Sequence, residues 1–420
     1  MKIANAFLLA IALALQTGYG ADKTNSPADT KTAISNAEQM KALRTEADNA
    51  HGVYAEAIQN QKSHDEIQKL WDAYFVIDKT NLSAVFELAR QEPASKPAFE
   101  SFAWIVTNQL TQGWVFDSNV LQTIEFLRDY HATNPNIAKI CWRLGRNWDP
   151  TCQPIMDLLR IAADKNPNRE VRGQATLALG RLKKDYSEAI VIWKNEPPGN
   201  ARQNEFMAAH LEKAKRENSE ALSREAGKLF NIVLDEYADC PTLQSTNSGR
   251  FMATLGEQAK VELYELANLT IGKTAPKIEG EGIDGKQFKL SDYRGKVVVL
   301  SFWAAWCGPC MAMVPSEVRL AERMKGKPFA LVGVNGDANR VNAKRAVENE
   351  KMTWPSFWSE KGSDGPIPTA WNIHAWPTVF VLDPNGVIRF RFEGYGQPTE
   401  SLLNRQVDQI FGQFSDKTGS

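Results

Sequence analysis

This sequence has almost no net charge and no long apolar run. The 49 basic and 50 acidic side chains leave a formal charge of -1, so no overall field attracts nucleic acid or anionic lipid. The apolar run from Ala6 to Leu15 is only half as long as the roughly 20 residues that span a bilayer. Hydrophobic residues make up 43% and charged residues 24%, the balance of a soluble globular protein. Polyanion-binding and membrane-spanning proteins are therefore disfavoured.

The N-terminus has the pattern of a secretory signal. Lys2 supplies the positive charge, Ala6 to Leu15 is the apolar stretch, and Gly18-Tyr19-Gly20 offers a small-x-small cleavage site. We expect residues 1–20 to be a signal peptide, followed by a polar tether over 21–35. No cysteine follows the apolar run, which excludes a lipid-modified cysteine at the mature N-terminus. The expected location is outside the cytoplasm, and the motifs below favour a bacterial periplasm.

Residues 36–268 carry apolar side chains at helical spacing. One such stripe has members at i, i+3, i+4, i+7 and i+8, which predicts a helix with one buried face; its residues are Ile67, Leu70, Trp71, Tyr74 and Phe75. Because 420 residues exceed the size of one ordinary core, we expect this all-α segment to form a domain of its own.

The tripeptide Asn-Pro-Asn occurs twice in this segment, at 134–136 and 166–168, each time ahead of a helical stretch. A proline suits the start of a helix because its missing N–H would have no partner there. The separation is close to the length of a helical-hairpin repeat. The segment therefore resembles TPR or HEAT arrays, and an irregular helical domain is the alternative. Such arrays bind protein partners through their concave face.

From residue 269 the pattern changes to strands alternating with helices. Asp284-Gly285 marks a hairpin turn, and the β-branched run 296–302 is typical of a strand covered on both faces. A helical segment over 307–324 separates it from a second buried run, 329–334. A hairpin over 378–392 and a final helix over 399–411 complete an α/β domain, expected over 269–414, with a polar tail over 415–420.

Two cysteines lie where the buried strand feeds this helix, in Trp306-Cys307-Gly308-Pro309-Cys310. A thiol at a helix N-terminus meets unpaired N–H groups that favour its negative form, the nucleophile in disulfide exchange. We predict that Cys307 attacks a substrate disulfide and that Cys310, one turn on, resolves the mixed disulfide. No bound cofactor is expected, because the redox-active disulfide itself carries the electrons.

A structural zinc site is the alternative for any such pair. It needs two further thiolate or imidazole ligands at suitable spacing. The remaining cysteines, Cys141, Cys152 and Cys240, are scattered through the helical segment, and no histidine pair lies beside them. We therefore expect no metal. Cys141 and Cys152 fit a structural disulfide and two buried thiols equally well.

The run from Phe302 to Cys310 resembles the active-site signature of thioredoxins. Together with 271–276, 290–296 and 379–383, it is similar to the TlpA/ResA branch of exported thiol:disulfide oxidoreductases, over about 271–412. The resemblance implies a thioredoxin-like fold, protein thiols or disulfides as substrates, and a thiol protein as electron donor. Gly308-Pro309 resembles the dipeptide of reducing family members, which favours a reductase.

In that family a cis-proline faces the cysteine pair, and Trp376-Pro377 occupies the matching place. The resemblance implies that the Trp376 backbone pairs with an extended substrate peptide. Trp306, Gly308 and Pro309, next to the thiols, and Trp376 and Pro377 are the predicted substrate-binding residues.

Two positions depart from the family pattern. Ser301 stands where thioredoxins have a buried Asp six residues before the first cysteine, and Met313 stands where many TlpA/ResA-like proteins have a Glu. Glu317, one turn further, is a candidate substitute, although we expect it to be a solvated surface residue. Two other functions stay open: a peroxiredoxin-like thiol peroxidase, disfavoured because the usual Thr context of its cysteine is lacking, and a partner-binding helical scaffold with an ancillary redox domain.

Overall fold

The computed structural model describes residues 35–60, 64–109, 118–145, 151–194, 212–243, 253–394 and 399–415. The predicted signal peptide, and nearly all of the predicted tether and tail, lie outside these residues. Helices fill the described chain up to Asn268, and strands appear from Glu279. The expected fold class, an α-helical N-terminal part followed by an α/β part, is confirmed.

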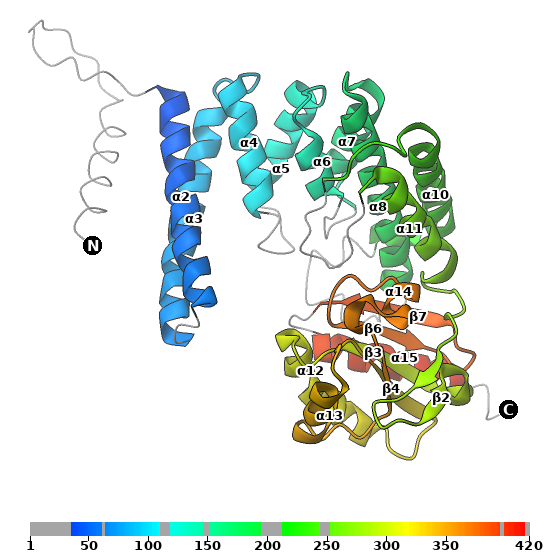
Figure 1. Ribbon diagram of the computed structural model, residues 1–420. Helices are drawn as coiled ribbons and strands as arrows, with labels where there is room; N and C mark the ends of the chain where they lie inside the picture. Colours follow the sequence, from blue (N-terminus) through cyan, green and yellow to red (C-terminus); the bar gives the residue numbers. More distant parts are fainter. Residues whose placement is uncertain are drawn as a thin grey trace, which may run out of the picture.

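Figure 1 shows the N-terminal helices side by side in an arc, with the sheet beneath α8 and α11 at one end. None of the described helices combines the length and the apolarity that crossing a bilayer requires. The helices are α2 (Asn36–Gln59), α3 (His64–Ala89), α4 (Lys96–Gln109), α5 (Ser118–Phe126) with a π-helical extension (Leu127–His131), α6 (Ala138–Leu144), α7 (Gln153–Lys165), α8 (Arg169–Lys194), α10 (Ser219–Glu236) and α11 (Leu255–Asn268).

Helix α8 is the centre of this region because it is buried on more than one side. Val171, Ala178 and Leu182 pack into the core shared with α2 to α7, whereas Leu177 packs with α10 and α11. Gly180 permits the close approach of α10, since a Cβ there would lie 2.6 Å from the Phe230 ring.

The two Asn-Pro-Asn loops have the same local structure and contact each other. In each, the first Asn side chain accepts a hydrogen bond from the backbone N–H two residues on, at 2.9 Å for Asn134 and 3.0 Å for Asn166. The buried Asn166 amide also donates to the backbone oxygens of Ala132 and Asn134, both at 3.0 Å. This stacking of equivalent loops is what a repeated helical hairpin produces.

The predicted stripe on α3 is only partly buried. Tyr74 is 7% exposed, but Phe75 is 42% exposed, so the prediction was wrong for Phe75. Figure 1 shows that part of the α2–α3 hairpin extends beyond α4, so few neighbouring elements are available to cover the full width of the stripe.

The C-terminal part contains a five-stranded sheet in the order β5-β4-β3-β6-β7. β3, β4 and β5 are parallel, and β6 and β7 are antiparallel to their neighbours. The predicted turn at Asp284-Gly285 joins a separate antiparallel pair. The elements are β1 (Glu279–Glu281), β2 (Gln287–Lys289), β3 (Val297–Trp303), α12 (Gly308–Arg323), β4 (Phe329–Asn335), α13 (Arg340–Asn349), β5 (Ser356–Trp358), α14 (Pro366–Ala370), β6 (Thr378–Leu382), β7 (Ile388–Glu393) and α15 (Thr399–Ser415).

All seven residues of β3 are buried, because helices and loops cover both faces of the sheet. Val299 and Trp303 face the core that includes α12, α13 and α15. Leu300 and Phe302 face the opposite core, which includes Trp371. The two-residue period of a strand therefore places Ser301 on the α12 face.

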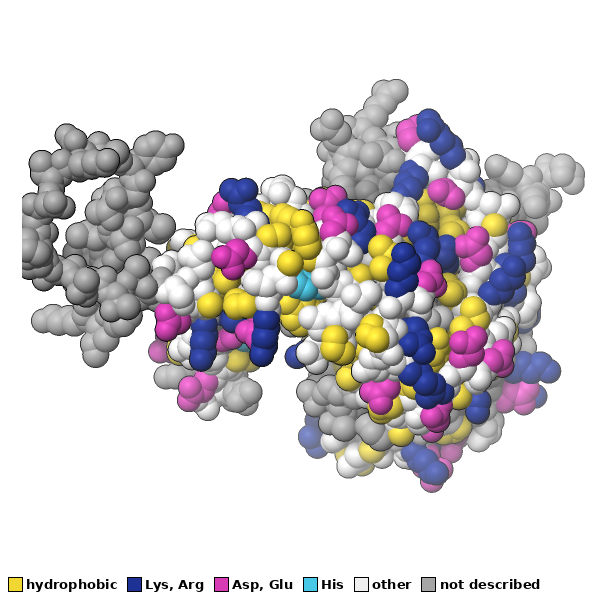
Figure 2. Space-filling model, turned by 90° about the horizontal axis from the view of Figure 1, so that it is seen from above, with side chains coloured by type: hydrophobic (Ala, Val, Ile, Leu, Met, Phe, Trp, Pro, Cys, Tyr) yellow, Lys and Arg dark blue, Asp and Glu magenta, His cyan; other side chains and the backbone are white. Residues whose placement is uncertain are grey.

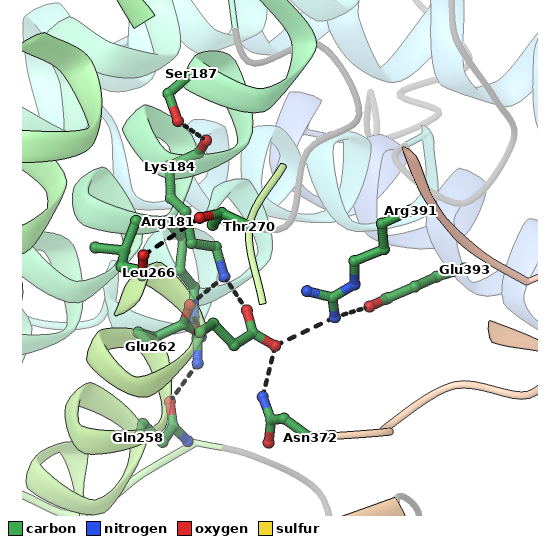
Figure 3. Close-up of polar contacts among 11 residues, drawn as sticks. Arg181, Lys184, Ser187, Gln258, Glu262, Leu266, Thr270, Asn372, Arg391 and Glu393 are labelled. Carbon is green, nitrogen blue, oxygen red and sulfur yellow. Dashed lines mark hydrogen bonds and ion pairs between the residues drawn. The ribbon is translucent and has the colours of Figure 1, made fainter. Parts of the chain in front are cut away.

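A buried cluster of charges joins the two parts of the chain (Figure 3). Glu265 of α11 accepts hydrogen bonds from Asn372 at 2.5 Å and from Arg391 of β7 at 3.2 Å, and it also pairs with Lys184 of α8. Lys184 pairs in addition with Glu262 at 2.5 Å. Burial alone would raise the pKa of Glu265, because it disfavours the charged carboxylate. The positive charges of Arg391 and Lys184 have the larger effect, so the pKa of this carboxyl group is lowered.

The outer surface carries charged residues of both signs. Figure 2 shows basic and acidic side chains interspersed over the face seen from above, as the formal net charge of -1 suggests. The described part of this face therefore carries no large patch of a single charge.

Candidate active site

Cys307 lies between the end of β3 and the start of α12, where it caps the helix N-terminus. Its Sγ accepts a hydrogen bond of 3.1 Å from the backbone N–H of Cys310 and is bonded to the Cys310 Sγ in a disulfide. Both cysteines are buried, Cys307 at 4% and Cys310 at 1% exposure. Once the disulfide is reduced, the unpaired N–H groups of this helix end favour negative charge on the Cys307 sulfur.

The loop that carries Cys307 is held by polar residues at the end of the neighbouring strand β4. The buried Asp337 carboxylate accepts hydrogen bonds from the Ala305 backbone N–H at 2.8 Å and from the Asn335 amide at 2.7 Å. Sequence reasoning missed Asp337 and Asn335. The available signal was their position at the end of a buried strand: Asn335 is the last residue of β4, Asp337 follows it, and the ends of parallel strands gather at one edge of a sheet.

Two tryptophans surround the cysteine pair on the outside. Trp306 is 59% exposed, and its ring meets Trp376 edge to face at 5.8 Å between centroids. The Trp306 indole donates to the Gly336 oxygen at 3.3 Å. Gly336 has to lack a side chain, since a Cβ there would lie 2.4 Å from the Trp376 ring. The two aromatic side chains predicted to contact substrate are therefore adjacent.

The other predicted substrate-binding residues differ in exposure. Gly308 and Pro309 are exposed at the start of α12, and Pro377 is buried. The Trp376–Pro377 peptide bond is cis, which confirms that prediction. The structure thus gives an exposed surface of Trp306, Gly308 and Pro309 next to Cys307, with Trp376 beside it.

Glu317 is buried at 2% exposure, so its prediction as a solvated surface residue was wrong. The error arose because α12 packs against the sheet along the face that carries Cys310, Met313 and Glu317. Burial raises the pKa of Glu317 to about 7, and the nearby Ser301 hydroxyl partly offsets that rise. Neither the Ser301 Oγ nor the Glu317 Oε1 has a hydrogen-bond partner among the described residues.

The remaining three cysteines are buried thiols in the helical region, and the alternative of a Cys141–Cys152 disulfide is not observed. Burial raises the pKa of Cys141 to about 12, which keeps it protonated near neutral pH. The described residues form no group of three or more Cys, His, Asp or Glu side chains suited to a metal ion. Among the described cysteines, the disulfide-bonded pair is therefore Cys307 and Cys310.

Comparison with known proteins places this site in a family. Residues 270–407 match the Redoxin family. The thiol-disulfide oxidoreductase ResA of Geobacillus kaustophilus is 30% identical over 146 residues, which cover 35% of this chain and 81% of that protein. The thioredoxin-like protein YneN of Bacillus subtilis is 31% identical over 28% of this chain and 68% of its own.

A solved structure is also similar. The thioredoxin domain of a thiol-disulfide oxidoreductase from Bacteroides vulgatus is 27% identical, covering 33% of this chain and 99% of that domain, with a TM-score of 0.31. The cysteine pair at a strand-to-helix junction and the extent of the match to ResA lead to one assignment. This chain belongs to the ResA-like thiol-disulfide oxidoreductases.

Proposed function

We propose that this oxidoreductase reduces disulfides of exported proteins, with Cys307 as the attacking thiol and Cys310 as the resolving thiol. The observation that supports these roles is the position of Cys307 at the N-terminus of α12, beside the exposed Trp306, with Cys310 buried one turn below. A substrate sulfur reaches Cys307 first, and Cys310 only from within the site.

Two exchange steps complete the reaction. The Cys307 thiolate attacks one substrate sulfur, the substrate disulfide breaks, and the leaving sulfur takes a proton. The Cys310 thiolate then attacks the Cys307 sulfur, which releases the second substrate thiol and closes the Cys307–Cys310 disulfide. Two electrons have passed from the cysteine pair to the substrate. Before the next turnover, an external dithiol protein must reduce the Cys307–Cys310 disulfide, and it is itself oxidised to a disulfide.

Substrate recognition is assigned to the surface around Cys307. Trp306, Gly308 and Pro309 would offer an exposed apolar contact, and the Trp376 backbone, ahead of Pro377, would pair with an extended segment as a neighbouring strand does. Apolar and backbone contacts of this kind tolerate many sequences. They suit an enzyme that acts on more than one protein.

Glu317 is proposed to accept the proton that Cys310 loses before it attacks. It lies two turns beyond Cys310 on the buried face of α12, and helix side chains lean towards the N-terminus, which brings its carboxyl group nearer to the thiol. A carboxyl group with a pKa of about 7 can exchange a proton with a thiol near neutral pH. Among the described residues no hydrogen bond joins Glu317 to Cys310, so the transfer would pass through water.

Glu317→Gln is expected to slow the resolving step by up to about a hundredfold at pH 8, where the carboxyl group of the wild type is ionised. The rise of the wild-type rate through pH 7 should be absent. The same substitution should increase the free energy of unfolding at pH 8. Because the pKa of Glu317 is higher in the folded protein than in the unfolded chain, its protonation stabilises the fold below pH 4.5. This contribution, roughly 3 kcal/mol, is lost as the pH rises through about 7. Because the glutamine amide does not ionise, the variant should be the more stable protein at pH 8.

Stopped-flow Trp fluorescence measures the resolving step, and urea unfolding at pH 5 and pH 8 measures stability. Glu322→Gln is the matched control, because Glu322 is exposed on the same helix. Identical pH profiles for the two variants would remove Glu317 from the mechanism.

The organisation around the redox site is also part of the proposal. Residues 36–268 and 269–414 would form the two domains of the protein. The first would bind a protein partner. Residues 1–20 would direct export. The signal-like sequence at the N-terminus and the exposed oxidoreductase site support this organisation. No bound cofactor is required, because the cysteine pair carries the electrons.

The reductase proposal is tested by the reduction of insulin with dithiothreitol as electron donor. The mature protein should accelerate precipitation of the insulin B chain, and Cys307→Ser should return the rate to that of dithiothreitol alone. A variant with Cys141, Cys152 and Cys240 all replaced by Ala or Ser should keep most of the activity. Full activity in Cys307→Ser would contradict the proposal.

A further inference from the structure

A cavity of about 300 Å³ lies in the helical region, between α2, α3, α4 and α6. Tyr74, which is 7% exposed, and the half-buried Trp142 form part of its wall. Tyr74 is also held by ring contact with His51 at 5.2 Å between centroids. The volume is at the lower end of that of small-molecule sites, and aromatic side chains commonly line such sites.

Two cations of α6 line the same cavity. Lys139 and Arg143 are four residues apart, so they lie on one side of the helix. Among the described residues no acidic side chain forms an ion pair with either, and the Arg143 Nε is buried without a hydrogen-bond partner. Burial lowers the pKa of Arg143, which shows that its charge is partly removed from water. A bound anion would offset that cost.

One acidic residue, Asp48, also lines the cavity. Its Oδ1 accepts a hydrogen bond of 2.9 Å from the Trp104 indole, so part of its hydrogen-bonding capacity is taken. Two basic residues against one acidic residue leave the lining with an excess of one positive charge. The cavity therefore suits a singly charged anion better than a cation.

We propose that this cavity binds a carboxylate attached to an apolar or aromatic body. Lys139 and Arg143 hold the carboxylate, and Tyr74 and Trp142 pack against the body. Such a group occurs in small organic acids and at the C-terminus of a polypeptide. The site contains none of the redox residues, so it extends the function beyond disulfide exchange and gives the helical region a ligand of defined chemistry.

The test is calorimetric titration of the mature full-length protein with matched pairs of compounds. N-acetylphenylalanine is compared with its amide, and an acetylated Ala-Ala-Ala-Phe peptide is compared with its C-terminal amide. Each acid should bind at least about tenfold more tightly than its amide, because charge-assisted hydrogen bonds to the carboxylate are lost in the amide. The preference should disappear in a Lys139→Gln, Arg143→Gln double variant.

Arg160→Gln is the control, because Arg160 is exposed on α7 and already pairs with Asp157. An unchanged helical circular dichroism signal and urea unfolding midpoint in the double variant would show that its fold is intact. Tighter binding of the peptide acid than of N-acetylphenylalanine would identify a polypeptide C-terminus as the ligand, and equal binding a free acid; both support the site. Equal affinity for acid and amide, a preference that survives in the double variant, or no binding of either acid at about 1 mM would overturn it.

Discussion

Replacing Cys310 by Ser is expected to make the protein accumulate mixed disulfides with its substrates. The Cys307 thiolate still attacks, but no second thiol remains to displace the bound substrate. Each molecule should stop after one turnover, and insulin reduction should fall to the rate of the reductant alone. Cys307→Ser should lose the same activity without forming mixed disulfides, because Cys310 lies inside the first turn of α12, behind the residue that caps the helix.

Non-reducing mass spectrometry of the purified variants after incubation with an oxidised substrate protein measures this difference. The adduct mass should appear only in Cys310→Ser and should map to Cys307. Adducts in Cys307→Ser but not in Cys310→Ser would reverse the assigned roles of the two cysteines.

Glu265→Ala is expected to destabilise the protein by about 3–5 kcal/mol, the usual penalty for removing one partner of a buried ion pair. Glu265 is the acid shared by Lys184, Arg391 and Asn372, so its loss leaves two buried cations with fewer partners. The pKa of Glu265 is lowered in the fold. Its stabilising contribution is therefore fully present above pH 4.5, the ordinary value for this group, and is lost as the pH falls.

Urea unfolding at pH 7, followed by circular dichroism, measures the change, with Glu400→Ala as control. Glu400 pairs with Arg319 at 2.7 Å, but both side chains are exposed, and such a pair contributes at most about 1 kcal/mol. A loss in Glu265→Ala no larger than that in Glu400→Ala would show that the cluster does not hold the two parts of the chain together.

The redox site was predictable because its sequence signals are local. Its three signals are adjacent in the sequence: the β-branched run that ends at Phe302, the helix that follows, and the cysteine pair at their junction. Helix and strand periodicity report this kind of organisation directly. The cis bond at Pro377 followed from the resemblance rather than from physical chemistry.

Burial of single polar residues was harder to predict. The side chain of Glu317 has the spacing of the apolar face of α12, but its charge favoured a surface position, and only the packing of that helix on β3 shows it to be buried. Asp337 reaches Ala305 across 32 residues of sequence, a contact that depends on the pairing of β3 with β4.

The contact between the two parts of the chain had no sequence signal at all. Glu265 and Arg391 are 126 residues apart, and each resembles an ordinary surface residue within its own element. Long-range ion pairs depend on the final arrangement of whole elements. Such ion pairs therefore cannot be predicted from a single sequence.

A redox titration of the mature protein in thiol/disulfide buffers, followed by Trp306 fluorescence, tests the central claim most directly. We expect one reversible two-electron transition, near or below roughly -250 mV as for a reductase, that is absent in Cys307→Ser and unchanged when Cys141, Cys152 and Cys240 are replaced. A transition that persists in Cys307→Ser, or no transition in the wild type, would contradict the assignment of Cys307 and Cys310 as the exchange centre.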